Sequence, residues 1–546
     1  MLGFLQTVFI GMLFAIVSAA SANAVAVVNA PGPSAELFNH PYYTCVTNYY
    51  VSATGSDSDS GTSTSTPWLT LQHANDSMPT SGAAAGSCIN VAPGTYAGGV
   101  SLTTGGKRAT SDGYVVYRCT KLDACNITAA GWTTGAFDAT LTGAGTKHPA
   151  YLIFDGFKIT ANASYQYSVA ISCWDGNVAT AATCHHWMML NNIISGYGEG
   201  GIDQADGEYY ISSHNTIHDN GIFCDGQIYG SGLSYVVPKA IANYTPKPDD
   251  TNARNNAALN LIGLQGPSFP FHNVVAWNVV YNNRNTCKGS DTDGNGIIMD
   301  SFSTGNGNTV SYTQPTLVAF NVVYNNGGGG VHIFFSEDVT AANNTVYNQY
   351  LDPNNVGAAR AGIDTNQSYS DTIINNLVVA IPPAPGKRGC AFGEKPYTQF
   401  NSAMLGGGIA GQPADSFSNN ITQLQGGNNS CWANFGQDSP TGENPMFNAD
   451  TYSCTANQCA TNPAWVNVGI GSTGTETKQP VGANFALEAD SPAIGFGLTE
   501  PWLPAQSVDA GACHHAEATC PVKHPNQRFG GARKFHEYKG LTWNPY

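Results

Sequence analysis

Four glycine-containing segments carry polar side chains at a shared spacing, and these side chains could do acid–base chemistry. In each, a Gly is followed by one apolar residue and then by a polar one, at Asp203, Ser234, His332 and Asp364. Histidine is the side chain whose ordinary pKa best suits proton removal near neutral pH, and carboxylates bind cations or polar substrates. The pattern therefore predicts a catalytic surface with His332 as its base.

The alternation of side chains along a β-strand predicts which residues share a face. The segment from Gly296 to Asp300 fits the same frame, and the segment of Asp364 extends to Asn366. The apolar residues expected to point into the core are Ile202, Leu233, Ile297, Val331 and Ile363. The outward residues expected to bind substrate beside the base are Asp203, Ser234, Asp364 and Asn366.

The turn before Asp300 is rich in oxygen-bearing side chains. Asp291, Asp293 and Asn295 all lie in it. Short, stiff loops with carboxylate and amide oxygens are what calcium prefers, so these residues and Asp300 are predicted to hold a calcium ion. A structural role is the alternative, because Asp and Asn beside Gly are also ordinary turn-forming residues.

An Asn-centred repeat indicates how these segments are arranged. WNVVYNN at 277–283 and FNVVYNN at 320–326 are near copies, and Asn recurs in this context at Asn192, Asn215, Asn278, Asn321, Asn344, Asn376 and Asn420. The gaps are 23, 63, 43, 23, 32 and 44 residues, so 23 is the bare unit and the longer gaps carry insertions. Short Val- and Ile-rich runs in such a repeat predict an all-β parallel β-helix in which the Asn side chains stack as a ladder.

The start of the chain and its cysteines predict export. Residues 1–24 form an apolar run that ends in small residues, as a signal peptide does, although Lys and Arg are missing from its start. There are 14 Cys, and close pairs such as Cys119 with Cys125 and Cys173 with Cys184 predict local disulfide bonds in an oxidising compartment. No later segment approaches membrane-spanning length. The protein is therefore expected to be secreted, with no membrane partner.

Charge and composition limit the class of partner. A net charge of -16 argues against nucleic acid, which needs a basic protein face. It would also repel a polyanionic sugar unless a cation bridged carboxylates on both sides. Only 11% of residues are charged and Gly reaches 62, which is typical of a turn-rich extracellular β protein. A solenoid would absorb the 546 residues into one elongated body.

Both ends of the chain resemble a known family. YYVSATGSDSDSG, PWLTLQHA and VAPGTY follow one another within 49–96, as in secreted right-handed parallel β-helix proteins of the pectate lyase-like class. ENPMF at 443–447 and NFALEADSPAIGFG at 484–497 resemble the final coil of that class. The resemblance implies a right-handed solenoid with Leu71 to Met78 as a short N-terminal capping helix. The expected divisions are a signal peptide at 1–24, an N-terminal extension at 25–48, the β-helix at 49–512 and an irregular C-terminal tail at 513–546.

The resemblance also bears on activity. In members that use a lysine as base, an NNG-x-G-F-K segment follows the acidic calcium coil, and NNGGGGVHI at 325–333 is similar to it with His332 at the lysine position. This implies β-elimination on a uronate polymer, in which calcium neutralises the sugar carboxylate and neutral His332 removes the C5 proton. Lys239 or Arg360 would stabilise the developing enolate or act as the base instead.

Three other functions stay open. A glycoside hydrolase would use Asp203 and Asp300 as acid and base across the glycosidic bond. A C5 epimerase would begin with the same proton removal as a lyase. A non-catalytic carbohydrate-binding or surface protein would use its Asn and Asp residues only in ladders and turns. The expected partner is a polysaccharide, acidic in the case of a lyase, and the protein is expected to be a monomer.

Overall fold

The structure is a computed structural model that describes most of the chain between residues 45 and 380 and shorter pieces beyond. The described residues are 45–107, 113–128, 135–139, 149–161, 169–174, 184–221, 230–242, 269–285, 293–304, 308–352, 361–380, 390–396, 415–418, 420–424, 465–467, 484–487, 497 and 509–512. The predicted signal peptide and the predicted tail lie outside them. No helix in these ranges is long and apolar enough to cross a membrane.

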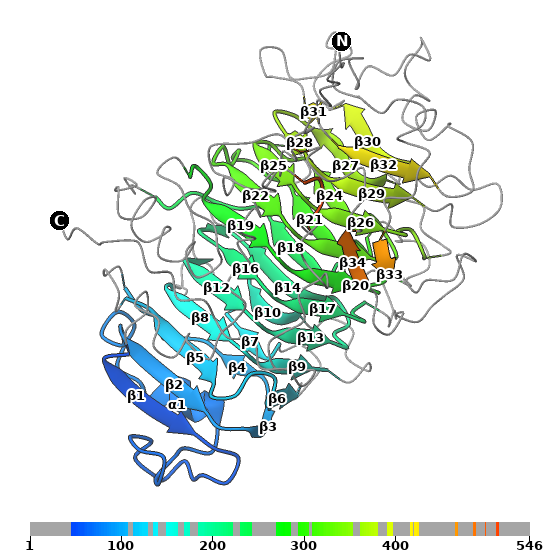
Figure 1. Cartoon of the computed structure of the whole chain (residues 1–546). Coiled ribbons are helices and arrows are strands. Elements are labelled where there is room, and N and C mark those ends of the chain that lie inside the picture. Colours follow the sequence, from blue (N-terminus) through cyan, green and yellow to red (C-terminus); the bar gives the residue numbers. More distant parts are fainter. Residues whose placement is uncertain are drawn as a thin grey trace, which may run out of the picture.

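Two long sheets of short parallel strands form adjacent sides of the molecule (Figure 1). The eleven-stranded sheet contains β1 (Thr47–Val51), β2 (Ser87–Val91), β5 (Val115–Cys119), β8 (Leu152–Asp155), β12 (Trp187–Leu190), β16 (Ile211–Ser213), β19 (Asn273–Ala276), β22 (Thr316–Ala319), β25 (Val339–Ala342), β28 (Thr372–Ile374) and β31 (Ser416–Ser418). The ten-stranded sheet contains β3 (Gly94–Ala97), β6 (Cys125–Thr128), β9 (Lys158–Thr160), β13 (Ile193–Ser195), β17 (Thr216–His218), β20 (Val279–Tyr281), β23 (Val322–Tyr324), β26 (Thr345–Tyr347), β29 (Leu377–Ala380) and β32 (Ile421–Leu424).

A third parallel sheet completes each coil. Its nine strands are β4 (Val100–Ser101), β7 (Phe137–Asp138), β10 (Val169–Cys173), β14 (Gly200–Ala205), β18 (Leu233–Val236), β21 (Ile297–Asp300), β24 (Val331–Phe334), β27 (Ala361–Ser368) and β30 (Cys390–Pro396). The chain visits the three sheets in turn, as in β12, β13 and β14 and then in β16, β17 and β18, and each strand pairs in parallel with its counterpart in the next coil. The predicted parallel β-helix is confirmed.

The predicted asparagine ladder fixes the corner between the eleven- and ten-stranded sheets. From Asn215 onward, each ladder Asn accepts a hydrogen bond at Oδ1 from the backbone N–H of the ladder Asn before it, at 2.8–3.0 Å. The sequence separations of these pairs are 23, 63, 43, 23, 32 and 44 residues, so insertions of very different length leave the stacking unchanged. All seven predicted residues, from Asn192 to Asn420, belong to this ladder.

The residue before a ladder Asn adopts an unusual backbone conformation. Its φ lies between 51° and 58° at Asn191, His214, Trp277, Phe320, Asn343 and Asn375. Left-handed backbone is uncommon for bulky residues such as Trp277 and Phe320 and persists only where the surroundings determine it. The hydrogen bonds of the ladder hold the backbone in this conformation. The rings of Trp277 and Phe320 stack on each other, with their centroids 4.9 Å apart.

Replacing Asn278 by alanine should lower the free energy of unfolding by about 2–5 kcal/mol, because several buried polar groups lose their partners. Its Oδ1 accepts from the N–H and Nδ2 of Asn215, and its Nδ2 donates to the carbonyl of Ser212. Urea unfolding followed by circular dichroism measures the effect. Asn126→Ala is the control, since partly exposed Asn126 accepts one hydrogen bond, from Thr160. Equal midpoints for the two variants would contradict a stabilising ladder.

A second amide ladder, not predicted from the sequence, runs along the corner that leads toward the nine-stranded sheet. Asn220 donates to Asn283, Asn283 donates to Asn326, and the N–H of Asn326 donates to Gln349 Oε1. The last member is a Gln and not an Asn, but its side-chain oxygen accepts the same kind of hydrogen bond. This ladder lies just before the strands that carry the predicted site.

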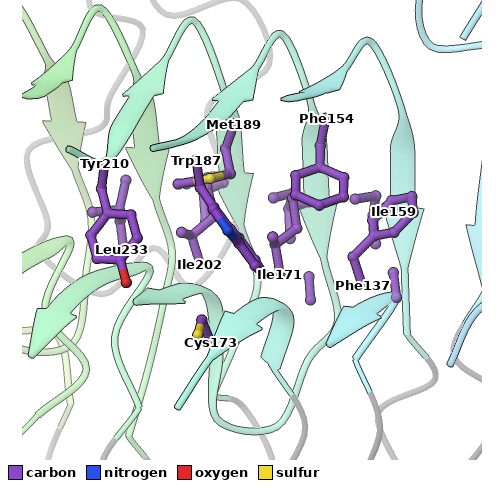
Figure 2. Close-up of a cluster of buried hydrophobic side chains, with 14 of the residues drawn as sticks. Phe137, Phe154, Ile159, Ile171, Cys173, Trp187, Met189, Ile202, Tyr210 and Leu233 are labelled. Atoms are coloured by element: carbon purple, nitrogen blue, oxygen red, sulfur yellow. The ribbon is translucent and has the colours of Figure 1, made fainter. Parts of the chain in front are cut away.

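The core is a continuous column of apolar side chains enclosed by the three sheets. Figure 2 shows part of it, with Phe137, Phe154, Trp187 and Tyr210 from successive coils lying one beyond another. Tyr117, Phe154 and Phe137 are in ring contact, and Phe154 continues to Trp187 at 5.5 Å. The rings are fully buried. Inward side chains from all three sheets therefore pack around one axis, and the chemistry must lie outside it.

The N-terminal end of the solenoid carries the predicted helix and a disulfide bond. Helix α1 (Leu71–Ser77) begins after Thr70, whose hydroxyl accepts from the N–H of His73, and it packs against β1 and β4. Leu71, Ala74 and Asn75 are its buried residues. The predicted pairs Cys119–Cys125 and Cys173–Cys184 are disulfide-bonded, and an unpredicted bond joins Cys45 to Cys88.

The far end differs from a simple continuation of the coils. β33 (Trp465–Asn467) and β34 (Asn484–Leu487) pair antiparallel with each other and belong to none of the three parallel sheets. The range 484–497 was expected to hold the final coil. Residues 509–512 instead run along the corner of the solenoid, where the N–H of Gly511 donates to Asn375 and the carbonyl of Asp509 accepts from Asn343. Two short strands, β11 (Cys184–His185) and β15 (Gly207–Glu208), form a separate parallel pair.

Candidate active site

The outer face of the nine-stranded sheet carries the predicted polar column. Strand register places Asp203 beside Ser234, and His332 beside Asp364. Ile298 lies between Ser234 and His332, so the column is continuous over five coils. The residues predicted to point inward are all fully buried, namely Ile202, Leu233, Ile297, Val331 and Ile363.

Asp300 and Asn366 lie in a second outward column, one on each side of Phe334. Register puts Asp300 on the strand next to His332 and two residues along it, which corresponds to roughly 8 Å between their Cα atoms. Asp300 and Phe334 are partly exposed, whereas Asn366 is buried. The ring of Phe334 stacks on that of His332 at 5.5 Å. Asp300, Phe334 and His332 thus border the same part of the surface.

A row of glycines positions these strands. A Cβ on Gly201, Gly232, Gly296 or Gly330 would lie only 2.5–2.8 Å from the carbonyl oxygen of the equivalent glycine in the next coil. Real Cβ atoms do not approach backbone so closely. The absence of a side chain therefore lets successive coils stack tightly just before each strand, which explains why glycine precedes each predicted site residue.

His332 and Asp364 form a hydrogen-bonded pair. Nδ1 of His332 lies 2.6 Å from Oδ2 of Asp364, and the two side chains come from the adjacent strands β24 and β27. An ionised carboxylate only accepts hydrogen bonds, so Nδ1 carries the hydrogen and Nε2 is left as the proton acceptor. His332 is 9% exposed and Asp364 is fully buried. His332 lies outside the apolar column, as predicted, but it is more enclosed than a freely solvated surface residue.

The electrostatic surroundings favour the charged form of His332. Burial alone would lower the pKa of the imidazole, but the negative charge and hydrogen bond of Asp364, with the charges of Asp293 and Asp300, raise that pKa above its ordinary value. Burial raises the pKa of Asp364, and His332 opposes that change. The neutral imidazole needed for proton removal is therefore populated at higher pH than the sequence alone suggested.

Carboxyl groups crowd the same face of the sheet. Burial and the charges of Glu199 and Asp300 raise the pKa of Asp203 to about 8. Burial and the charge of Asp293 raise the pKa of Glu199 to about 7. Oδ1 of Asp203 is buried and has no hydrogen-bond partner in the described part of the chain. Asp203 thus keeps its proton at neutral pH in large part and can act there as a neutral hydrogen-bonding group.

The predicted calcium site lies only partly within the described residues, so it stays a prediction. Oδ1 of Asn295 accepts a hydrogen bond from the N–H of Gly329 at 2.7 Å, and its Nδ2 donates to Ser231 and Asp293. Within the described ranges, no group of three or more His, Cys, Asp or Glu could hold a metal ion. Asp291, one of the four predicted ligands, lies outside those ranges.

Of the two alternative cations, only Lys239 lies within the described residues, and it is hydrogen-bonded to a residue outside the predicted columns. Lys239 is buried, and its Nζ donates to Oδ1 of Asn308, whose Nδ2 donates to the carbonyl of Ser301. Burial lowers the pKa of Lys239, and Asp206 opposes that change. The ammonium group of Lys239 is therefore already hydrogen-bonded to Asn308, which lies after the end of β21. Arg360 lies outside the described residues.

Glu199 is a site residue that the sequence reasoning missed. It directly precedes the glycines at 200 and 201, and its carboxyl group acts on both Asp203 and Asp293 through charge. The alignment of glycine segments could have found it, because the residue before the glycine run is also polar at Asn295. The other predicted substrate-binding residues, Ser234 and Asn366, occupy their predicted outward positions.

Comparison with known proteins finds similar solved structures but no matching family. No family model matches the sequence, and neither does any curated protein. Among solved structures, XylC in complex with xylose is similar at a TM-score of 0.39 and 13% identity, over 70% of this chain and 76% of that one. The pectate lyase Pel9A is similar at a TM-score of 0.36 and 15% identity, over 86% and 97%. The A-module of the mannuronan C-5 epimerase AlgE4 of Azotobacter vinelandii is similar at a TM-score of 0.29 and 10% identity, over 62% and 89%.

At these identities and TM-scores, the matches carry no information about substrate or reaction. The strand pairing, the amide ladders and the glycine row define the parallel β-helix by themselves. The predicted resemblance to the pectate lyase-like class is confirmed for the fold.

Proposed function

We propose that this chain is a secreted enzyme that cleaves a uronate-containing polysaccharide by β-elimination. The observation that carries the proposal is the His332–Asp364 pair on the outer face of the nine-stranded sheet, with Nδ1 and Oδ2 2.6 Å apart. A histidine oriented by a carboxylate is the arrangement expected of a general base. The three disulfide bonds in the described part of the chain support an oxidising, extracytoplasmic environment.

The proposed reaction uses one proton acceptor. Nε2 of His332 takes the C5 proton of the uronate, the C4–C5 double bond forms, and the C4–O bond breaks. The imidazolium then returns the proton to the departing oxygen, which balances the step. Asp364 holds Nδ1–H, fixes the ring orientation and stabilises the positive charge while it exists. Phe334 packs against the imidazole ring and limits its rotation.

The carboxylate of the sugar must be neutralised before its C5 proton becomes acidic enough to remove. Asp203 supports binding by a neutral group, because its pKa is raised to about 8 and the protonated carboxyl can donate a hydrogen bond to the sugar carboxylate. A calcium ion held by Asp291, Asp293 and Asp300 would supply the same neutralisation, and it remains a prediction to be tested by chelation.

C5 epimerisation is the second candidate, because it starts with the same proton removal by His332. It differs in returning a proton to the opposite face of the sugar, and it leaves the glycosidic bond intact. Hydrolysis by Asp203 and Asp300 has less support. Register separates their Cα atoms by two strands and two residues, roughly 12 Å. The two side chains would therefore have to lean toward each other to bring their carboxyl groups to the separation of about 5–9.5 Å found in hydrolytic pairs.

A panel of acidic and neutral polysaccharides, each with calcium and with chelator, tests the proposal. We expect a uronate polymer to give unsaturated products that absorb in the ultraviolet, and chelation to lower the rate if the predicted calcium site exists. Reducing ends without that absorbance would indicate hydrolysis. Exchange of the C5 proton with deuterated solvent, without cleavage, would indicate epimerisation. Retention of a polymer with no chemical change would sink the enzymatic proposal and leave a binding protein.

A further inference from the structure

We propose that Trp174 forms a distal sugar-stacking subsite, so that the protein binds a polysaccharide strand laid along the coils from Trp174 to His332. The inference deepens the proposed function and depends on it for the ligand class, a polysaccharide. It adds a second point of contact on this face and a minimum chain length for the substrate.

Trp174 stands out by its exposure. It is 48% exposed, while the other exposed large apolar side chains of the described chain are the aliphatic Val46, Leu69 and Val310. Single exposed aliphatic residues are common on protein surfaces. An exposed indole offers a broad, rigid apolar face with a hydrogen-bond donor at its edge, which suits the mixed apolar and hydroxyl surface of a sugar ring.

The place of Trp174 in the sheet links it to the base. β10 ends at Cys173, which pairs with Gln204 of β14. Register continued by one residue sets Trp174 beside Ala205, in the outward column that also contains Asp300 and Phe334. Four strand spacings separate Trp174 from the strand of His332, which is roughly 19 Å along the stack. A glycan that touches both must therefore extend over several sugar residues.

The surface between the two points is suited to a glycan. The neighbouring outward column holds Asp203 between the mostly buried Ser172 and Ser234. Asp203 is partly exposed, and so is Val236 in the column of Trp174. The raised pKa of Asp203, about 8, keeps it largely neutral at pH 7, so that it does not repel an acidic sugar.

The backbone next to Trp174 is fixed. Cys173 is buried and is bonded to Cys184. The preceding residues of β10 are held by parallel pairing with β14. This anchoring limits the backbone freedom that is lost when Trp174 binds a ligand.

Trp174→Ala tests the subsite in two measurements. With the polymer that the wild-type protein cleaves, we expect KM to rise about 10-fold, equivalent to about 1.4 kcal/mol, with kcat nearly unchanged. With oligosaccharides too short to reach from His332 to Trp174, we expect no change in KM. Trp174→Phe should restore most of the affinity because it keeps an aromatic face. Leu69→Ala is the control, since Leu69 is an exposed apolar residue at the N-terminal end of the solenoid.

Binding without turnover separates this inference from the proposed chemistry. Calorimetric titration of the His332→Gln variant with and without Trp174→Ala should show the same 10-fold loss for the polymer. If the wild-type protein cleaves the polymer and Trp174→Ala binds it normally, the subsite is wrong and the function stands. If Trp174→Ala weakens binding of a polymer that the wild-type protein never alters, the subsite stands and the lyase chemistry is wrong. An equal loss for short and long ligands, or no binding of any polymer, overturns the subsite.

Discussion

Replacing His332 by glutamine lowers kcat by about 10²–10⁴-fold on any polysaccharide that the wild-type protein cleaves, because the site loses its proton acceptor. Glutamine can still donate an N–H to Oδ2 of Asp364, as Nδ1 of His332 does over 2.6 Å. Asp364 is fully buried, so it needs that donor. Initial rates under substrate saturation, with the circular dichroism spectrum as a check on the fold, measure the effect.

Alanine is the less informative replacement at this position. It would leave the buried Asp364 without its partner, and removing one member of a buried pair costs about 3–5 kcal/mol of stability. A loss of activity in His332→Ala could then come from unfolding. Comparing the thermal midpoints of the alanine and glutamine variants separates the two causes.

The chain offers a matched control for His332. His218 on the ten-stranded sheet also pairs with an aspartate, with Nδ1 2.7 Å from Oδ2 of Asp219. His218→Gln makes the same chemical change outside the proposed site and should keep full activity. Undiminished turnover in His332→Gln would remove the assignment of the base, whatever the control does.

Replacing Asp364 by asparagine should lower kcat by roughly 10²–10⁴-fold and move the rise of activity with pH to lower pH. In the wild-type protein the carboxylate raises the pKa of His332, and activity requires the neutral imidazole, so activity increases as pH rises through that raised pKa. Without the negative charge, burial dominates and lowers the pKa of the imidazole. The neutral form is then present at lower pH, but the ring is less well oriented.

The pH–rate profile distinguishes positioning from mere structural support. A structural role would lower activity at every pH without moving the midpoint of the rising limb. Asp219→Asn is the matched control and should leave both the rate and the midpoint unchanged. A midpoint that moves to higher pH in Asp364→Asn would contradict the direction of the electrostatic argument.

Much of the fold was predictable because its rules are local and repeat. Alternation of faces along each strand placed Val331 inward and His332 outward without knowledge of the rest of the molecule. The recurrence of Asn in one context identified a ladder whose members must coincide once per coil, whatever the intervening length. The site columns followed, because glycine marked the start of each strand.

The features that escaped prediction depend on neighbours in other coils. The pairing of His332 with Asp364 joins residues 32 apart and assigns Asp364 a positioning role, where substrate binding was expected. The hydrogen bonding of Lys239 to Asn308 joins residues 69 apart. Trp174 was not singled out because its strand lacks the glycine signature. In each case the role of the residue depends on its burial or on a partner in another coil, and the local sequence pattern predicts neither.

The asparagine ladder separates coil length from coil stacking. Pairs 23 and 63 residues apart in sequence make the same hydrogen bonds. The forty extra residues between Asn215 and Asn278 therefore do not change the hydrogen bonding of the ladder. Segments of new length or chemistry can therefore enter between two strands while the ladder holds the coils in place. Such a scaffold can accept new surface segments over evolution, or by grafting in the laboratory, without moving the His332–Asp364 pair.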